Sequence, residues 1–106
     1  MQNAESKVLQ ITEVKVFPAK DGGRLKAYAT VVFNNCFIIR DLKVIEGHKK
    51  LFVSMPSRKR KDGTFRDIVH PLNSGMRTEI EQRVINEYEK VREHGYAGVE
   101  FVDDFA

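Results

Sequence analysis

The stretch Leu51–Arg77, LFVSMPSRKRKDGTFRDIVHPLNSGMR, decides how the rest of the chain is organised. It predicts a strand, a basic turn, a second strand and the start of a helix. Within the turn, Asp62-Gly63 favours a tight reversal, because glycine adopts positive φ without a steric cost. The turn also holds consecutive cations, which an apolar core cannot bury unpaired. We therefore expect all of them to face solvent: Arg58, Lys59, Arg60 and Lys61.

Working outward from this stretch, five segments have the composition and alternation of β-strands. Short links rich in Pro, Gly and Asn join them. Consecutive strands must therefore run antiparallel, because a parallel crossover needs about a dozen residues or more. The expected strands are Lys7–Phe17, Arg24–Phe33, Cys36–Ile45, Leu51–Met55 and Phe65–Val69.

The second and third of these segments carry the clearest packing signals. Alternate residues of the second segment are apolar, and the small Ala27 and Ala29 at its middle indicate that the helix packs on that face. The run Cys36–Ile39 is continuously apolar, which predicts a central and well-covered strand. Between the two segments, Asn34-Asn35 predicts a turn, since asparagine tolerates left-handed conformations.

A helix is expected after the fifth strand. Asn73 or Ser74 can cap it by accepting hydrogen bonds from its free N–H groups. Thr78 with Glu81 also fits a capping box, which would start the helix one turn later. Gly95 predicts where the helix ends. Apolar residues at helical spacing predict one buried face, formed by Met76, Ile80, Val84, Tyr88 and Val91.

These elements predict an α+β fold: a small antiparallel meander of about five strands, one long helix and a short C-terminal extension. At 106 residues, the chain is expected to form a single domain over 1–106. Residues 1–6 are polar and are expected to be frayed. Residues 96–106 mix apolar and acidic side chains, and are expected to form a short strand or helix that docks on the body or on a second subunit.

The composition argues against several classes of protein. No apolar run reaches the roughly 18 residues of a membrane span, and no apolar segment follows a basic N-terminus as in a signal peptide. Cys36 is the single cysteine, so the chain cannot form an intrachain disulfide or a cysteine-rich metal site. A cytoplasmic protein without a cofactor is therefore expected.

Catalysis and metal binding are not expected either. Asp67, His70 and Ser74 are residue types that form nucleophilic triads, but the strand-to-helix segment lacks the glycines of a nucleophile elbow. His70, which precedes Pro71, is expected instead to hydrogen-bond the turn and fix the entry to the helix. The three histidines, His48, His70 and His94, fall in three different elements without a local ligand pair.

The distribution of charge points to nucleic acid. The formal net charge is only +3, but between residues 49 and 66 Asp62 is the one anion among clustered cations. Such clusters neutralise phosphates and release counterions, and the first turn of a helix adds free N–H groups. The same charges also fit a solvated loop that only keeps the protein soluble. The candidate nucleic-acid-binding residues are Lys50, Arg58, Lys59, Arg60, Lys61, Arg66 and Arg77.

Contacts to bases, as opposed to phosphates, would come from the exposed side of the first half of the helix, because a helix fits the major groove of DNA. The side chains expected there are Arg77, Thr78, Glu81 and Arg83.

A series of short motifs runs through the same stretch: Met55-Pro56-Ser57, Asp62-Gly63, Phe65–Ile68, His70-Pro71, Asn73-Ser74 and later Glu87-Tyr88. Together they resemble, without gaps, the stage V sporulation protein G (SpoVG) family, the bacterial septation regulators. The similarity covers about Val8 to Tyr88. The family often has a neutral pair where this chain has Arg60-Lys61, so this chain is more basic at the turn.

The resemblance implies a homodimeric regulator that binds DNA or RNA and is linked to septation, cell division and sporulation control. Two functions follow. The first is regulatory nucleic-acid binding through residues 58–61 and the start of the helix. The second is a protein–protein adaptor in septum formation without nucleic-acid binding, whose partners are division or regulatory proteins. The apolar-acidic extension and the open edges of the meander motivate this alternative.

Overall fold

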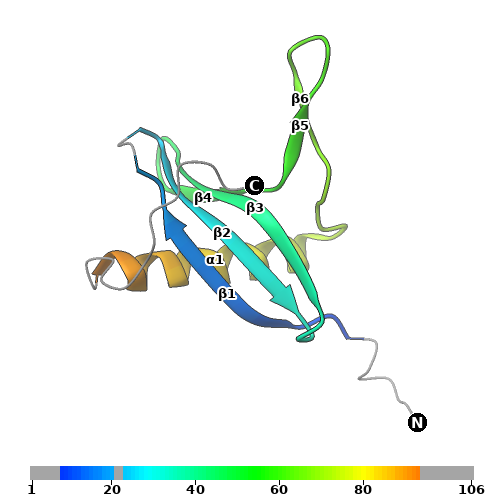
Figure 1. The fold of residues 1–106 in the computed structure, drawn as a ribbon, viewed down its shortest axis with the longest axis vertical. Helices are drawn as coiled ribbons and strands as arrows, with labels where there is room; N and C mark the ends of the chain where they lie inside the picture. The colour runs from blue at the N-terminus through cyan, green and yellow to red at the C-terminus, as the bar shows by residue number, and fades with distance from the viewer. Residues whose placement is uncertain (1–7, 21–22, 94–106) are drawn as a thin grey trace.

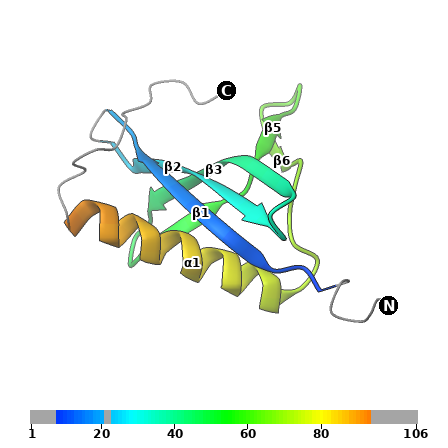
Figure 2. The same cartoon turned by 60° about the horizontal axis from the view of Figure 1, so that its bottom comes forward.

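The computed structural model describes residues 8–20 and 23–93. It shows a four-stranded antiparallel sheet in the order β1-β2-β3-β4, with one helix across a face of the sheet and a separate two-stranded ribbon, β5-β6, that projects from this body (Figures 1 and 2). The elements are β1 (Ile11–Pro18), β2 (Leu25–Phe33), β3 (Phe37–Glu46), β4 (Leu51–Ser54), β5 (Ser57–Lys59), β6 (Phe65–Asp67) and α1 (Ser74–Glu93).

The α+β fold with a single long helix is confirmed, and so is the antiparallel meander for the first four strands. The fifth predicted strand corresponds to β6, but β6 does not extend the main sheet. It pairs with β5, which begins inside the predicted basic turn. Arg58 and Lys59 therefore belong to a strand, and only the residues after them form the turn.

The core lies between α1 and one face of the sheet. Ala27 and Ala29 of β2 are each 0% exposed, so their small side chains allow the helix to approach the sheet closely, as the sequence predicted. The helix contributes the predicted stripe: Ile80, Val84 and Tyr88 are buried, and Met76 packs against them partly exposed. Burial of this apolar face is the main stabilising contribution to the fold.

The expectation that the start of β3 is well covered is wrong. Phe37 and Ile38 are 61% and 46% exposed. β3 pairs with β2 along its length, but β4 is short and pairs with β3 only over Lys43–Glu46. Among the described residues, no strand pairs with the segment Phe37–Leu42 on that side, so part of a central strand has an open edge.

The turn between β2 and β3 and the N-terminal cap of α1 both agree with the sequence prediction. Asn34 and Asn35, between β2 and β3, have φ of 53° and 54°, in the left-handed region. At the helix start, the side-chain Oδ1 of Asn73 accepts a hydrogen bond from the backbone N–H of Met76 at 2.7 Å. Asn73 is therefore the cap, and the later start at Thr78 is not used.

Glu81 and Arg83 attach the helix to both edges of the sheet. Glu81 Oε2 accepts a hydrogen bond from the N–H of Val53 in β4 at 3.2 Å. Arg83 Nη1 donates to the carbonyl of Ile11 in β1 at 3.3 Å. Because β1 and β4 are the outer strands, these two side chains satisfy backbone groups that the sheet leaves unpaired. The sequence predicts both side chains to be free for contacts with bases, and these hydrogen bonds correct that prediction.

Several expectations concern residues outside the described part of the chain: the frayed segment 1–6, the helix end at Gly95 and the extension 96–106. Within the described part, no helix has the length and apolar character needed to cross a membrane.

Candidate nucleic-acid interface

The ribbon, residues 57–67, brings most of the predicted binding residues together. β5 and β6 pair antiparallel, with Arg58 directly opposite Arg66 and Lys59 opposite Phe65. Residues opposite one another in a ladder share a face, so the side chains of the two arginines project from the same face of the ribbon. Like charges placed in this way weaken strand pairing by about 0.2–1 kcal/mol. The ribbon therefore keeps a charge arrangement that does not favour its own folding.

The turn that closes the ribbon is held by local hydrogen bonds. The N–H of Arg60 donates to the carbonyl of Thr64, 2.6 Å away, and the N–H of Gly63 donates to the carbonyl of Arg60 at 3.0 Å. Gly63 has φ of 93°, which side chains disfavour. This confirms the predicted reversal at Asp62-Gly63.

Asp62 is the acid of the turn itself, and its carboxylate is engaged there. Oδ1 accepts from the hydroxyl of Thr64 at 2.7 Å and from the N–H of Thr64 at 3.0 Å. These two hydrogen bonds lower the pKa of Asp62 below its ordinary value. The ionised carboxylate thus stabilises the turn at neutral pH, and this contribution is lost as pH falls through the lowered pKa.

The base of the ribbon is anchored to the core. Met55 is buried, and the carbonyl of the next residue, Pro56, accepts hydrogen bonds from the N–H groups of Ile68 at 2.8 Å and Val69 at 3.5 Å. Beyond this anchor, β5 and β6 contact one another but no other described helix or strand. The ribbon projects from the body (Figure 1), and all its residues except the half-buried Ser57 are exposed.

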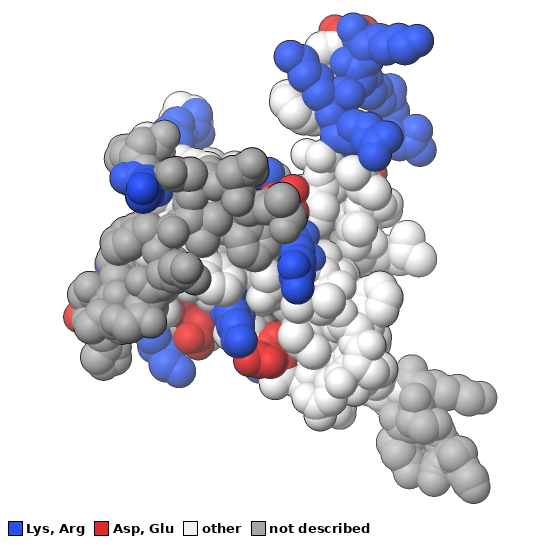
Figure 3. Space-filling view, viewed as in Figure 1, with Lys and Arg blue, Asp and Glu red and all other residues white. Residues whose placement is uncertain are grey.

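A hollow of about 610 Å³ lies along the ribbon. Figure 3 shows Lys and Arg side chains gathered on this projecting part of the molecule. Among the described residues, no cation of the ribbon forms an ion pair with an acid, so the positive charge is not neutralised internally. The residues that line the hollow are Arg58, Lys59, Arg60, Arg66, Asp67, Ile68 and His70.

Of the predicted binding residues, Arg58, Lys59, Arg60 and Arg66 therefore share one site, and Lys61 follows them in the turn. Arg77 is exposed in the first turn of α1 and does not line the hollow.

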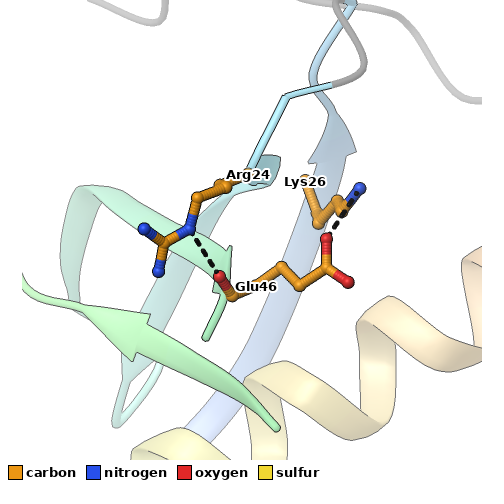
Figure 4. Close-up of polar contacts among 3 residues, drawn as sticks. All are labelled: Arg24, Lys26 and Glu46. Atoms are coloured by element: carbon orange, nitrogen blue, oxygen red, sulfur yellow. Dashed lines mark hydrogen bonds and ion pairs between the residues drawn. The ribbon is translucent and has the colours of Figure 1, made fainter. Parts of the chain in front are cut away.

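Lys50 belongs to a different surface. It lies in the loop between β3 and β4 and lines a second hollow of about 430 Å³ with Lys49 and Arg92. At this end of the sheet, the side chains of two further cations contact Glu46, one through its backbone and one through its carboxylate (Figure 4). Arg24 Nε donates to the backbone carbonyl of Glu46 at 3.0 Å, and Lys26 Nζ lies 3.3 Å from the carboxylate of Glu46. This second surface is thus partly neutralised, unlike the ribbon.

The residues that suggested a triad are not assembled. Nδ1 of His70 lies 3.1 Å from the carbonyl oxygen of Pro71, in agreement with a role at the helix entry. In residues 8–20 and 23–93, no hydrogen bond joins Asp67, His70 and Ser74 to one another. Over the same residues, no group of three His, Cys, Asp or Glu side chains is placed to hold a metal ion.

Comparison with known proteins places the sequence of this chain in a family. The sequence profile of SpoVG matches residues 9–90, which include the whole ribbon and most of α1. The chain belongs to the SpoVG family. The resemblance of its motifs is thereby confirmed, and the match extends over all four strands of the main sheet.

Individual SpoVG relatives cover most of the chain. A protein of Bdellovibrio bacteriovorus is 57% identical over 82 residues, 77% of this chain and 75% of the relative. One from Anaeromyxobacter dehalogenans is 51% identical over 89 residues, 84% and 87% of the two chains. One from Myxococcus xanthus is 48% identical over 91 residues, 86% and 91% of the two chains. Each is named "Putative septation protein SpoVG", a name that mentions septation and no catalytic activity.

Proposed function

We propose that this SpoVG protein is a regulatory nucleic-acid-binding protein, not an enzyme, and that it contacts the phosphates of DNA or RNA through the ribbon. The observation that carries the proposal is the opposed pair Arg58 and Arg66, held with other unpaired cations along one hollow. Guanidinium groups bind phosphate oxygens through two parallel hydrogen bonds. A bound phosphate also removes the repulsion between the two arginines, so binding and ribbon pairing support each other.

A salt series tests this function. We expect mixed-sequence DNA and RNA, followed by fluorescence anisotropy, to lose affinity steeply as salt increases. If all five ribbon cations contact phosphates, the logarithm of the association constant should fall with the logarithm of salt with a slope of about −4.5 for duplex DNA and about −3.5 for a single strand. A flat response, or no binding at low salt, would show that the cations only solvate the ribbon.

The functional unit is a homodimer in this proposal, since two ribbons double the number of phosphate contacts. The open edge of β3 at Phe37–Leu42, with the exposed Phe37 and Ile38, supports the proposal that a second copy covers it.

Sedimentation equilibrium should then give twice the chain mass for the native protein and the chain mass for Phe37→Asp. Phe52→Asp, at an exposed phenylalanine of β4, should leave the dimer intact. A native protein of single-chain mass at micromolar concentration contradicts this arrangement.

A septation adaptor that does not bind nucleic acid is the second candidate. The names of the relatives favour it, as does an apolar pocket of about 140 Å³ formed by the sheet and the first half of α1, lined in part by Leu9, Phe37 and Met76. Absence of binding in the salt series would favour this candidate over the first. Retained binding in which neutral substitutions on the ribbon reduce the salt slope would count against it.

A further inference from the structure

Phe65 is the exposed aromatic residue of the ribbon. It lies in β6, is 69% exposed, and stands directly opposite Lys59 in β5. Its neighbours across the ribbon and along the chain, Lys59 and Arg66, both line the cationic hollow. The ribbon contacts no other described element, so the fold provides no apolar surface against which the ring packs. Single exposed apolar residues are common on protein surfaces, but this ring lies among cations that line a hollow, which is the setting that a bound ligand would use.

The flat face of a nucleobase complements this arrangement. Proteins that bind single strands combine a positively charged groove for the backbone with aromatic rings on which bases stack. Here the hollow supplies the charge and Phe65, at its margin, supplies the ring. In a duplex the base faces are covered by their neighbours, and only a wedge driven between base pairs reaches them. The ribbon tip has no such wedge, because it consists of Lys61, Asp62 and Gly63.

We propose that Phe65 stacks on an unpaired base, and that the ribbon therefore prefers single-stranded nucleic acid to duplex. The proposal rests on the phosphate-binding function above and names its substrate class. Phosphates lie in the hollow, one of them beside Lys59, which shares a face of the ribbon with Phe65, and the base attached to that phosphate lies against the ring. Stacking does not depend on base identity, so little sequence preference comes from this contact.

Affinity and salt dependence separate the ring from the charges. For a single-stranded oligonucleotide, Phe65→Ala and Phe65→Leu should bind about 5- to 150-fold more weakly than the native protein, because stacking a base on an aromatic ring contributes about that factor. The salt slope should not change, since no charge is removed. Phe65→Tyr should bind as the native protein does. Circular dichroism checks that each variant remains folded, which its 69% exposure leads us to expect.

Fluorescence reports the stacking directly. The native chain has no tryptophan, so Phe65→Trp introduces a single indole whose emission a stacked base quenches. We expect saturable quenching by a single-stranded oligonucleotide and much less by the same sequence as a duplex. Phe52→Trp is the matched control, because Phe52 is also exposed (37%) but does not line the cationic hollow. Its emission should not respond to the oligonucleotide.

The outcomes distinguish this inference from the function on which it rests. Steep salt dependence with native affinity in Phe65→Ala and no quenching in Phe65→Trp would leave the phosphate site in place and overturn the stacking. Equal quenching by duplex and single strand would overturn the single-strand preference. Absence of any salt-dependent binding would overturn the phosphate site itself. Quenching by a protein partner in place of nucleic acid would assign Phe65 to the adaptor function.

Discussion

Replacing Arg58, Lys59, Arg60 and Lys61 together by glutamine is expected to abolish most nucleic-acid binding without unfolding the protein. Each phosphate contact contributes about 0.9 to the salt slope on duplex DNA, so four lost contacts reduce the slope by about 3.6 for each ribbon that is bound. At 0.1 M salt the same term corresponds to roughly a 10³-fold weaker association. The fold should persist, because β5 and the turn contact no element of the main sheet or helix. Anisotropy titrations over a range of salt concentrations measure both quantities.

A second variant separates the position of the charges from their number. Replacing Lys15, Lys43, Lys90 and Arg92 by glutamine removes as many positive charges from the body, where each lies near an acid. This control should lose much less affinity than the ribbon variant. Equal losses in the two variants would mean that net charge, and not the ribbon, attracts the nucleic acid.

Leu42→Ala should lower the free energy of unfolding by about 2–5 kcal/mol. Leu42 lies in β3, is 2% exposed and belongs to the core cluster between the sheet and α1. Shortening it removes apolar contacts and leaves a cavity that the surrounding strands fill only in part. Since the total stability of a small domain is about 5–15 kcal/mol, this loss removes a large share of it. Urea denaturation followed by circular dichroism gives the change.

Leu72→Ala is the matched control, with the same chemical change at a residue that is 91% exposed. Its free energy of unfolding should stay within about 0.5 kcal/mol of the native value. If Leu42→Ala were as stable as Leu72→Ala, the core would have to lie elsewhere than between α1 and this face of the sheet.

The sequence predicts the sheet well because its main signal is alternation. In β2, every second side chain is apolar, and the structure buries Ala27, Ala29, Val31 and Phe33 on the helix side. The helix is similarly well predicted, since Ile80, Val84 and Tyr88 recur at its period and Asn73 has the chemistry of a cap. These patterns are local, and the fold uses them directly.

The features that the sequence does not predict are contacts between elements far apart along the chain. A strand with polar residues on both faces has no alternation, so the pairing of β5 with β6 cannot be read from Arg58-Lys59. The apolar run at Phe37 predicts a covered strand. Whether it is covered depends on the length of β4, and β4 pairs only with Lys43–Glu46, so the run at Phe37 gives no information on this. Glu81 and Arg83 looked like solvent-facing helix residues, whereas they bond the two outer strands.

The candidate site was predicted in composition and only partly in geometry. Clustered charge identified the ribbon cations correctly as exposed, because consecutive cations cannot be buried. It also grouped Lys50 with them, although Lys50 lies in the second hollow. The sequence places Phe65 in a strand, which is correct, but nothing in it indicates that the ring is exposed.

The ribbon joins the body only at its base, where Pro56 accepts hydrogen bonds from Ile68 and Val69, and this has a consequence for how the protein can diverge. The residues that hold the sheet and helix together contain none of the ribbon's cations, and the ribbon contributes nothing to the core cluster. Substitutions in 57–67 can therefore alter what the protein recognises while leaving its folding intact. Selection can act on ligand choice here separately from selection on stability, as it does in the loops of an antibody domain.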